Sequence, residues 1–229
     1  MIPYQFLAIE GNIGAGKTSL CTKLAEDWSY KLVLEQFSDN PFLPMFYEAP
    51  DQHAFAVELF FMAERYQQLQ DHLLKQDLFH KGTLADYFFL KTLLFAGKTL
   101  KGDEFRLFKR LFEILNANFP KPELLVYLYR SVPNLLKNIA KRGRPYEAEI
   151  TADYLQNIQQ AYLDYFKLEQ GIPILVLDLG DRDFLEDDQI YTEIKSSLGE
   201  LYQPGIHLKS IGATSEAAAS GLSRLLDRS

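Results

Sequence analysis

Residues 11–18 combine glycines with a lysine and a threonine at a spacing that suits phosphate binding. They read Gly-Asn-Ile-Gly-Ala-Gly-Lys-Thr, which fits G-x-x-x-x-G-K-[ST] at every fixed position. Glycines let the backbone curl so that successive N–H groups point at phosphate oxygens. Lys17 is expected to reach the β- and γ-phosphates, and the Thr18 hydroxyl is placed to ligate Mg²⁺. We therefore predict a nucleoside triphosphate site formed by Gly11, Asn12, Ile13, Gly14, Ala15, Gly16, Lys17 and Thr18.

Two acidic residues lie directly after apolar runs of strand length. Glu35 follows residues 32–34, and Asp86 follows residues 83–85. In phosphoryl transfer to a hydroxyl group, one carboxylate accepts the proton of the acceptor and another helps to hold the metal. Beside a phosphate-binding loop, two such acids supply both roles. The alternative interpretation is that each is a solvated acid at the end of a strand.

The elements that must position these residues alternate between apolar runs and stretches of helical period. Strands are expected over residues 4–9, 32–34, 83–85, 124–129 and 174–177. Their apolar character is continuous, which is typical of strands covered on both faces. Right-handed crossovers then give an α/β fold, a doubly wound five-stranded parallel sheet flanked by helices. Ligands are expected at the carboxyl ends of its strands.

A long helix is expected over residues 52–78 and a second over residues 103–118. The first carries an apolar stripe at spacings of three and four residues, formed by Phe55, Leu59, Met62, Tyr66, Leu69 and Leu73. Glu58 and Arg65 fall together at one border of that stripe, where side chains are half buried. The two helices could line the sheet or form a dimer contact, and the sequence leaves both open.

The composition excludes several classes of protein. The chain has 229 residues, with 24 Lys and Arg against 31 Asp and Glu, and a net charge of −7 at pH 7. This acidic balance argues against a nucleic-acid or membrane-surface partner. Cys21 is the single cysteine, which excludes an internal disulfide and a cysteine-based metal site. Nothing resembles a signal peptide or a membrane span, so we expect a soluble cytoplasmic protein.

The composition changes past about residue 205. Residues 1–205 are expected to form the phosphate-loop domain. Residues 206–229, rich in Ala, Ser and Gly from residue 210 onward, are expected to form a loosely ordered tail.

Three segments together resemble the deoxyribonucleoside kinase family, which comprises the deoxycytidine, deoxyguanosine and deoxyadenosine kinases and their bacterial relatives. They are residues 10–18, the Tyr-Glu-Ala-Pro sequence at 47–50 and the Lys-Arg-Gly-Arg sequence at 141–144. Their order and spacing match over about residues 5–198. The resemblance implies a P-loop kinase fold, a homodimer, and ATP- and Mg²⁺-dependent phosphorylation of a deoxyribonucleoside at its 5′-hydroxyl for nucleotide salvage.

The resemblance also implies roles for residues at matching positions on the acceptor side. Glu35 matches the general base that acts on the 5′-hydroxyl, and Asp86 matches an acid associated with magnesium. Tyr47 and Glu147 match a pair that holds the 3′-hydroxyl of the sugar.

On the donor side, Arg142 and Arg144 match lid arginines that gather phosphate charge together with Lys17. Phe184 resembles an aromatic residue near the donor adenine, where it and Arg142 would face the base. The alternative for the arginines is a helix end, with basic residues on the helix dipole and Gly143 as the cap. The alternative for Phe184 is packing in the core.

Two departures from the family pattern concern the acceptor. Relatives usually carry an arginine and then a serine after the acid of the third strand, whereas Tyr87 and a phenylalanine follow Asp86 here. A tyrosine cannot stabilise phosphate charge as a guanidinium does. Another cation must then do so, and the candidates are Arg65, Arg142 and Arg144.

The second departure is Glu58, which stands where relatives present a glutamine amide to the nucleobase. An ionised carboxylate accepts hydrogen bonds without donating any, so it needs donors on the base. Adenine, cytosine and guanine have them, and thymine is the poorest match. Arg65 matches a base-side arginine, while Lys91 or Thr92 occupies the stretch of a base-reading aspartate. We predict a purine substrate with deoxyadenosine first; the alternative for Glu58 and Arg65 is an intrahelical charge pair.

Two other functions stay open at this point. A nucleoside monophosphate kinase would need basic residues on the acceptor side, where Glu35, Glu58 and Glu147 have the wrong sign. A catalytically impaired, nucleotide-binding regulatory protein is the second alternative, and Tyr87 in place of an arginine favours it.

Overall fold

The predicted α/β fold is present in the computed structural model, which describes residues 2–35, 40–73, 79–144, 147 and 149–212 apart from the side chains of Tyr47 and Pro50. Contacts divide the chain into two compact units. We call them the sheet unit, which consists of Met1–Leu32, His80–Asp86 and Pro122–Ser229, and the helical unit, which consists of Val33–Phe79 and Tyr87–Lys121.

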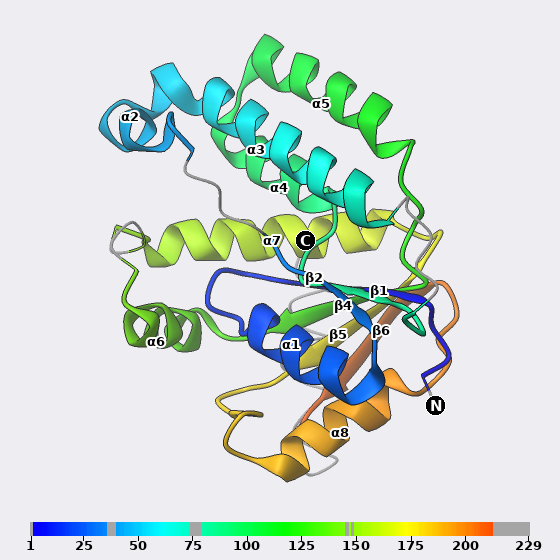
Figure 1. Cartoon of the computed structure of the whole chain (residues 1–229). Helices are drawn as coiled ribbons and strands as arrows, with labels where there is room; N and C mark the ends of the chain where they lie inside the picture. The colour runs from blue at the N-terminus through cyan, green and yellow to red at the C-terminus, as the bar shows by residue number, and fades with distance from the viewer. Residues whose placement is uncertain (1, 36–39, 74–78, 145–146, 148, 213–229) are drawn as a thin grey trace. The chain divides into compact units, whose positions relative to one another are not determined.

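Over the part of the chain that the structure describes, the sheet has six strands in the order β2-β3-β1-β4-β5-β6 (Figure 1). The strands are β1 (Phe6–Gly11), β2 (Lys31–Val33), β3 (Thr83–Ala85), β4 (Leu124–Tyr129), β5 (Pro173–Asp178) and β6 (Gly205–Ser210). β1 lies between β3 and β4 and pairs with both in parallel. β4 and β6 in turn pair in parallel with β5. The three central strands β1, β4 and β5 are largely buried, as their continuous apolar runs predict.

The sixth strand corrects the predicted count of five. β6 lies at the edge of the sheet beside β5, in a segment that the composition assigns to the tail. The sequence pattern fails here because His207 and Lys209 interrupt the apolar residues and the strand stays mostly half exposed. An edge strand of this kind lacks the continuous apolar run of a covered strand. Residues 213–229 of the predicted tail lie outside the described residues, so their organisation stays a prediction.

Helices cover both faces of the sheet. They are α1 (Lys17–Trp28), α6 (Val132–Arg142), α7 (Ala152–Leu168) and α8 (Asp188–Leu198). α1 and α8 lie on one face and α7 on the other (Figure 1). The Tyr191 hydroxyl of α8 donates to Asp27 of α1 at 2.9 Å. On the opposite face, Tyr162 and Phe166 of α7 pack on Tyr127 of β4, with ring centroids 4.9 and 5.2 Å away.

The helical unit consists of α2 (Leu43–Glu48), α3 (Pro50–Leu73), α4 (Leu90–Thr99) and α5 (Gly102–Asn116). α3 and α5 correspond to the two long helices predicted from the apolar stripes, and residues 74–78 of the first prediction lie outside the described residues. None of the helices within the described ranges is both long and apolar enough to cross a membrane.

Aromatic and aliphatic side chains give the helical unit a core of its own. The predicted stripe of α3 is buried at Met62 and Leu69, while Leu59 is exposed. Phe89, just before α4, stacks on Phe112 of α5 with ring centroids 5.1 Å apart. The Phe89 ring also lies 6.2 Å from the ring of Tyr66 on α3, so α3 and α4 pack side by side. Glu58 and Arg65 lie on α3, and Lys91 lies on α4.

Candidate active site

The predicted phosphate-binding loop joins β1 to α1, which begins at Lys17. Gly14 and Gly16 adopt left-handed backbone conformations with φ of 80° and 95°, which residues that carry a Cβ rarely adopt. A Cβ on Gly14 would lie 2.8 Å from the backbone oxygen of Leu135. The conformation therefore requires glycine, and it leads into the N-terminus of a helix, where anions bind well.

Hydrogen bonds to two helices hold the first half of the loop. Asn12 is buried and donates through Nδ2 to the backbone oxygen of Leu155 at 2.7 Å. Asn138 of α6 donates to the backbone oxygen of Gly14 at 2.8 Å. The shape of the loop thus depends on tertiary contacts that the motif itself does not specify.

Two further side chains support the second half of the loop. The buried Arg130, which follows β4, donates through Nε to the backbone oxygen of Ala15 at 3.3 Å. Phe184 is 2% exposed, and its ring lies 3.3 Å from the place that a Cβ on Gly16 would take. Phe184 therefore packs under the loop in this structure, and its predicted contact with the donor adenine stays a prediction.

Lys17, which is predicted to reach the β- and γ-phosphates, lies along the loop in this structure. Its Nζ donates to the backbone oxygens of Gly11 at 2.8 Å and Asn12 at 3.0 Å. A phosphate group would compete with these neutral carbonyls for the ammonium, because hydrogen bonds between two charged groups are stronger.

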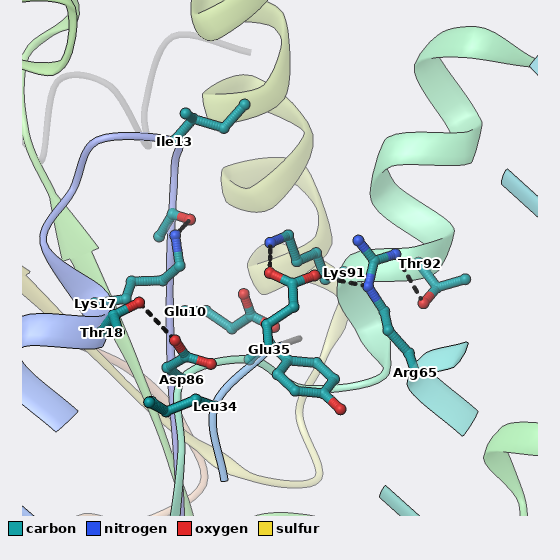
Figure 2. A network of polar contacts seen from close by, with 12 residues as sticks. Glu10, Ile13, Lys17, Thr18, Leu34, Glu35, Arg65, Asp86, Lys91 and Thr92 are labelled. Carbon is teal, nitrogen blue, oxygen red and sulfur yellow. Dashed lines mark hydrogen bonds and ion pairs between the residues drawn. The ribbon is translucent and has the colours of Figure 1, made fainter. Parts of the chain in front are cut away.

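Thr18 and Asp86 bring two oxygen atoms together, as the predicted magnesium site requires. The Thr18 hydroxyl donates to Asp86 Oδ2 at 2.7 Å (Figure 2), and Asp86 is buried at the end of β3. Mg²⁺ prefers oxygen ligands and is usually bound by one or two carboxylates together with substrate phosphates and water. A hydroxyl and a carboxylate beside a phosphate-binding loop fit that preference.

The two predicted lid arginines share one carboxylate at the end of α6. Arg142 donates to both oxygens of Glu147, with Nε 3.0 Å from Oε2, and Arg144 Nη1 lies 3.6 Å from Oε1. The arginines are about one third exposed, whereas Glu147 is buried. Gly143 caps α6 with φ of 67°, so the alternative prediction for the arginines, a capped helix end, also describes this segment.

Tyr47, the predicted partner of Glu147 on the sugar, belongs to α2, and its side chain lies outside the described residues.

In the helical unit, Glu35 follows β2, and its side chain is 6% exposed. Arg65 of α3 donates through Nε to Glu35 Oε1 at 2.9 Å, and the ammonium of Lys91 on α4 contacts Oε2 (Figure 2). Opposite charges this close favour the ionised carboxylate, which is the form that a general base needs. Arg65, one of the candidates to replace the arginine that is absent at Tyr87, thus contacts the predicted base Glu35. Lys91 contacts the same carboxylate.

Glu58 and Arg65 are buried rather than half buried, because α4 packs against α3 on that side. Glu58 accepts a hydrogen bond from Thr99 Oγ1 at 2.8 Å, and Arg65 Nη1 donates to Thr92 Oγ1 at 3.3 Å. Each side chain therefore has a partner on α4, and Glu58 in addition interacts electrostatically with Arg65 of its own helix. Burial raises the pKa of Glu58 to about 7, against smaller opposing effects of Thr99 and Arg65. Both protonation states of Glu58 are consequently populated near neutral pH.

Tyr87, which stands where relatives carry an arginine, is fully buried in the helical unit. Its hydroxyl donates to Gln68 Oε1 at 2.6 Å, and Gln68 Nε2 donates to the backbone oxygen of Leu34 at 2.5 Å. Leu34 immediately precedes Glu35. Tyr87 therefore supports the backbone beside the predicted base.

Sequence reasoning missed the contribution of three residues: Lys91, Gln68 and Arg130. A signal existed for Lys91, because a lysine within the apolar stretch 87–96 must find a partner once that stretch is buried. Arg130 directly follows β4, the same kind of position that identified Glu35. Gln68 has no such signal, since a glutamine on a long helix is ordinarily a surface residue.

Comparison with known proteins gives a consistent result. The family model Deoxynucleoside kinase matches residues 7–202. A deoxyguanosine kinase from Bacillus subtilis (strain 168) is 36% identical over 203 residues, which is 86% of this chain and 97% of that protein. A deoxyadenosine/deoxycytidine kinase from the same organism is 26% identical over 211 residues, covering 86% of this chain and 93% of that protein. A solved structure of deoxyadenosine kinase from M. mycoides with bound dATP has the same fold, with a TM-score of 0.72 at 19% identity over 85% of this chain and 100% of that chain. The chain belongs to the deoxynucleoside kinase family, whose members are phosphotransferases.

Proposed function

We propose that this chain transfers the γ-phosphate of ATP to the 5′-hydroxyl of a purine deoxyribonucleoside, with Mg²⁺, in nucleotide salvage. The observation that carries the proposal is the buried Glu35 carboxylate with a cation at each oxygen. A carboxylate offers about four acceptor sites, so two cations do not prevent it from accepting the proton of a hydroxyl. In a chain that also has a phosphate-binding loop, a base of this kind suits phosphoryl transfer to an alcohol.

In the proposed reaction, the 5′-oxygen of the sugar forms a bond to the γ-phosphorus of ATP. The bond between that phosphorus and the β,γ-bridging oxygen breaks, and its electron pair leaves with ADP. The proton of the hydroxyl passes to Glu35. Lys17, Arg142 and Arg144 are proposed to compensate the phosphate charge that redistributes during transfer.

The remaining assignments concern the metal and the sugar. Thr18 and Asp86 would hold Mg²⁺, which when bound neutralises charge on the phosphate oxygens. Tyr47 and Glu147 are proposed to hold the 3′-hydroxyl, from the family resemblance. In the structure Glu147 already engages the two arginines, so occupation of the sugar site and placement of the arginines would be coupled.

Glu58 is the residue that we propose for reading the nucleobase. When ionised, its carboxylate can accept from both the N1–H and the N2 amino group of guanine. When protonated, it can donate to N1 of adenine and accept from the N6 amino group, as a glutamine amide would. Its pKa of about 7 makes both forms available. We therefore propose that deoxyadenosine and deoxyguanosine are both substrates, and the preference for deoxyadenosine predicted from the sequence would apply to the protonated form.

The test is an activity panel with ATP and Mg²⁺ in which ADP production is measured with the four deoxynucleosides and the four deoxynucleoside monophosphates. The proposal expects turnover with deoxyadenosine and deoxyguanosine. Turnover with monophosphates would instead favour a monophosphate kinase. ATP binding by calorimetry without turnover on any acceptor would favour an impaired regulatory protein. The homodimer and the cytoplasmic location stay predictions.

A variant pair tests the base directly. Glu35→Gln keeps the shape of the side chain but removes its capacity to accept the proton, so kcat should fall by about 10²- to 10⁴-fold while ATP binding persists. Glu104→Gln, an exposed acid in the first turn of α5, is the matched control and should leave kcat unchanged. Full activity of Glu35→Gln would show that another group takes the proton.

A further inference from the structure

The Glu35 carboxylate is held by two cations from two different helices. Arg65 of α3 donates to Oε1 at 2.9 Å, and Lys91 of α4 contacts Oε2 (Figure 2). All three side chains are buried, with exposed fractions of 6–7%. Removal of three charged groups from water is costly, so the arrangement calls for an explanation beyond the stability of the fold.

Lys91 is fixed at the start of α4. Its backbone N–H donates to the Phe88 oxygen at 3.0 Å, and its ammonium lies 5.4 Å from the centroid of the Phe95 ring. A buried ion pair of this kind contributes little net stability compared with an apolar residue of similar size. An opposite charge at this distance favours the ionised form of a carboxylate in general, and the contact with Oε2 restricts the orientation of the Glu35 carboxylate.

Arg65 and Lys91 differ in the contacts that each cation makes besides its ion pair with Glu35. Arg65 also donates to Thr92 at 3.3 Å, and its guanidinium lies 5.2 Å from the Phe61 ring, so its plane is set by several contacts. Lys91 presents a compact charge on a flexible stem. Relatives carry an arginine at position 87, whereas the Tyr87 hydroxyl here donates to Gln68. Lys91, four residues later, places a positive charge on Glu35.

We propose that Lys91 is a positioning residue for the phosphoryl transfer, which keeps the Glu35 carboxylate ionised and oriented toward the 5′-hydroxyl. The inference rests on the proposed function, because it assigns Lys91 a task only if Glu35 is the base. It goes beyond that function by naming the cation that replaces the arginine absent at Tyr87.

The pH dependence of turnover is the readout that separates this role from a structural one. Among the described residues of the helical unit, the charged groups that contact Glu35 include Arg65 from α3 and Lys91 from α4. Glu58 on α3 interacts with the same Arg65 and itself titrates near neutral pH. The profiles are therefore measured in the natural chain and again with Glu58→Gln as background, so that titration of Glu58 does not obscure the acid limb.

Three variants are compared from pH 5.5 to 9.5: Lys91→Met, Lys91→Arg and Lys98→Met. Loss of the nearby positive charge should move the acid limb of kcat upward by about one pH unit or more in Lys91→Met. At pH values below both acid limbs its kcat should be about tenfold lower for each unit of displacement, and above the displaced limb it should return toward the kcat of the natural chain. Lys91→Arg keeps the positive charge, so its acid limb of kcat should lie close to the pH position found for the natural chain. Lys98→Met alters an exposed lysine of the same helix and should match the natural chain.

The result that would overturn the inference is an acid limb in Lys91→Met that superimposes on that of the natural chain, whether or not kcat is lower. Circular dichroism and KM for ATP establish that the variant is folded. If Lys91→Met fails to fold, Lys91→Gln replaces it, with the same expected displacement and the same refuting result. Failure of the proposed function looks different, because the natural chain would then show no turnover with any deoxynucleoside at any pH.

Discussion

The buried carboxyl of Glu58 gives a quantitative prediction about stability. Its pKa is about 7 in the folded chain, against 4.5 as the ordinary value. Between these two pH values the folded state binds more protons than the unfolded state, so the free energy of unfolding decreases as pH rises through that window. At about 1.4 kcal/mol per pH unit, the full effect of the rise from 4.5 to 7 is about 3.5 kcal/mol.

Glu58→Gln removes this titration while it keeps an oxygen that can accept the Thr99 hydrogen bond. The variant should have nearly the stability of the natural chain below about pH 3.5, where the carboxyl is mostly protonated in both states. Its advantage should be about 2.5 kcal/mol larger at pH 8 than at pH 5, from integration of the same linkage. Urea unfolding of both proteins at several pH values measures the difference.

Glu113→Gln on α5 is the matched control, because that acid is exposed; its stability difference from the natural chain should vary little with pH. A constant difference between Glu58→Gln and the natural chain from pH 5 to 8 would refute the reasoning. It would mean that the carboxyl stays hydrated in solution, or that the interaction with Arg65 outweighs burial.

Three further predictions follow from the same contacts. The ratio of kcat/KM for deoxyguanosine to that for deoxyadenosine should rise between pH 6 and 8 as Glu58 ionises, and should be flat in Glu58→Gln; competition assays at fixed ATP measure it. Gly14→Ala should weaken ATP binding at least about tenfold by calorimetry, because its φ of 80° and the 2.8 Å approach to Leu135 force the loop to shift. Tyr87→Phe leaves Gln68 without its hydroxyl donor, so it should lower stability by about 1–3 kcal/mol and reduce kcat more than ATP affinity.

The phosphate-binding loop and the central strands could be predicted from sequence because their requirements are local. Gly14 and Gly16 are needed for backbone angles that follow from the loop itself, and covered strands need continuous apolar runs. β6 could not be predicted in the same way, because it is the last strand of the sheet and pairs with β5 alone. The pattern of an edge strand depends on which neighbours happen to cover it.

The acceptor-side residues of the helical unit show a different limit. The helical periodicity places Glu58 and Arg65 at the border of a stripe, but only the packing of α4 decides that the border is buried. Lys91 is visible in the sequence as a charge within an apolar stretch, yet nothing local identifies Glu35 as its partner. The two residues are 56 positions apart, and that contact is specified by the fold of the whole unit.

The two acids that interact with Arg65 have environments that push their protonation in opposite directions. Glu35 has a cation at each oxygen, whereas Glu58 has a hydroxyl donor, burial and the more weakly felt Arg65. Groups separated in this way can take different tasks at one pH. In the proposed function, Glu35 would accept the proton of the hydroxyl and Glu58 would alternate between two hydrogen-bonding patterns. Because Arg65 stabilises the charge of both, its removal should make both acids harder to ionise. That change would slow transfer and shift the base preference toward adenine together, whereas loss of Lys91 should affect transfer alone.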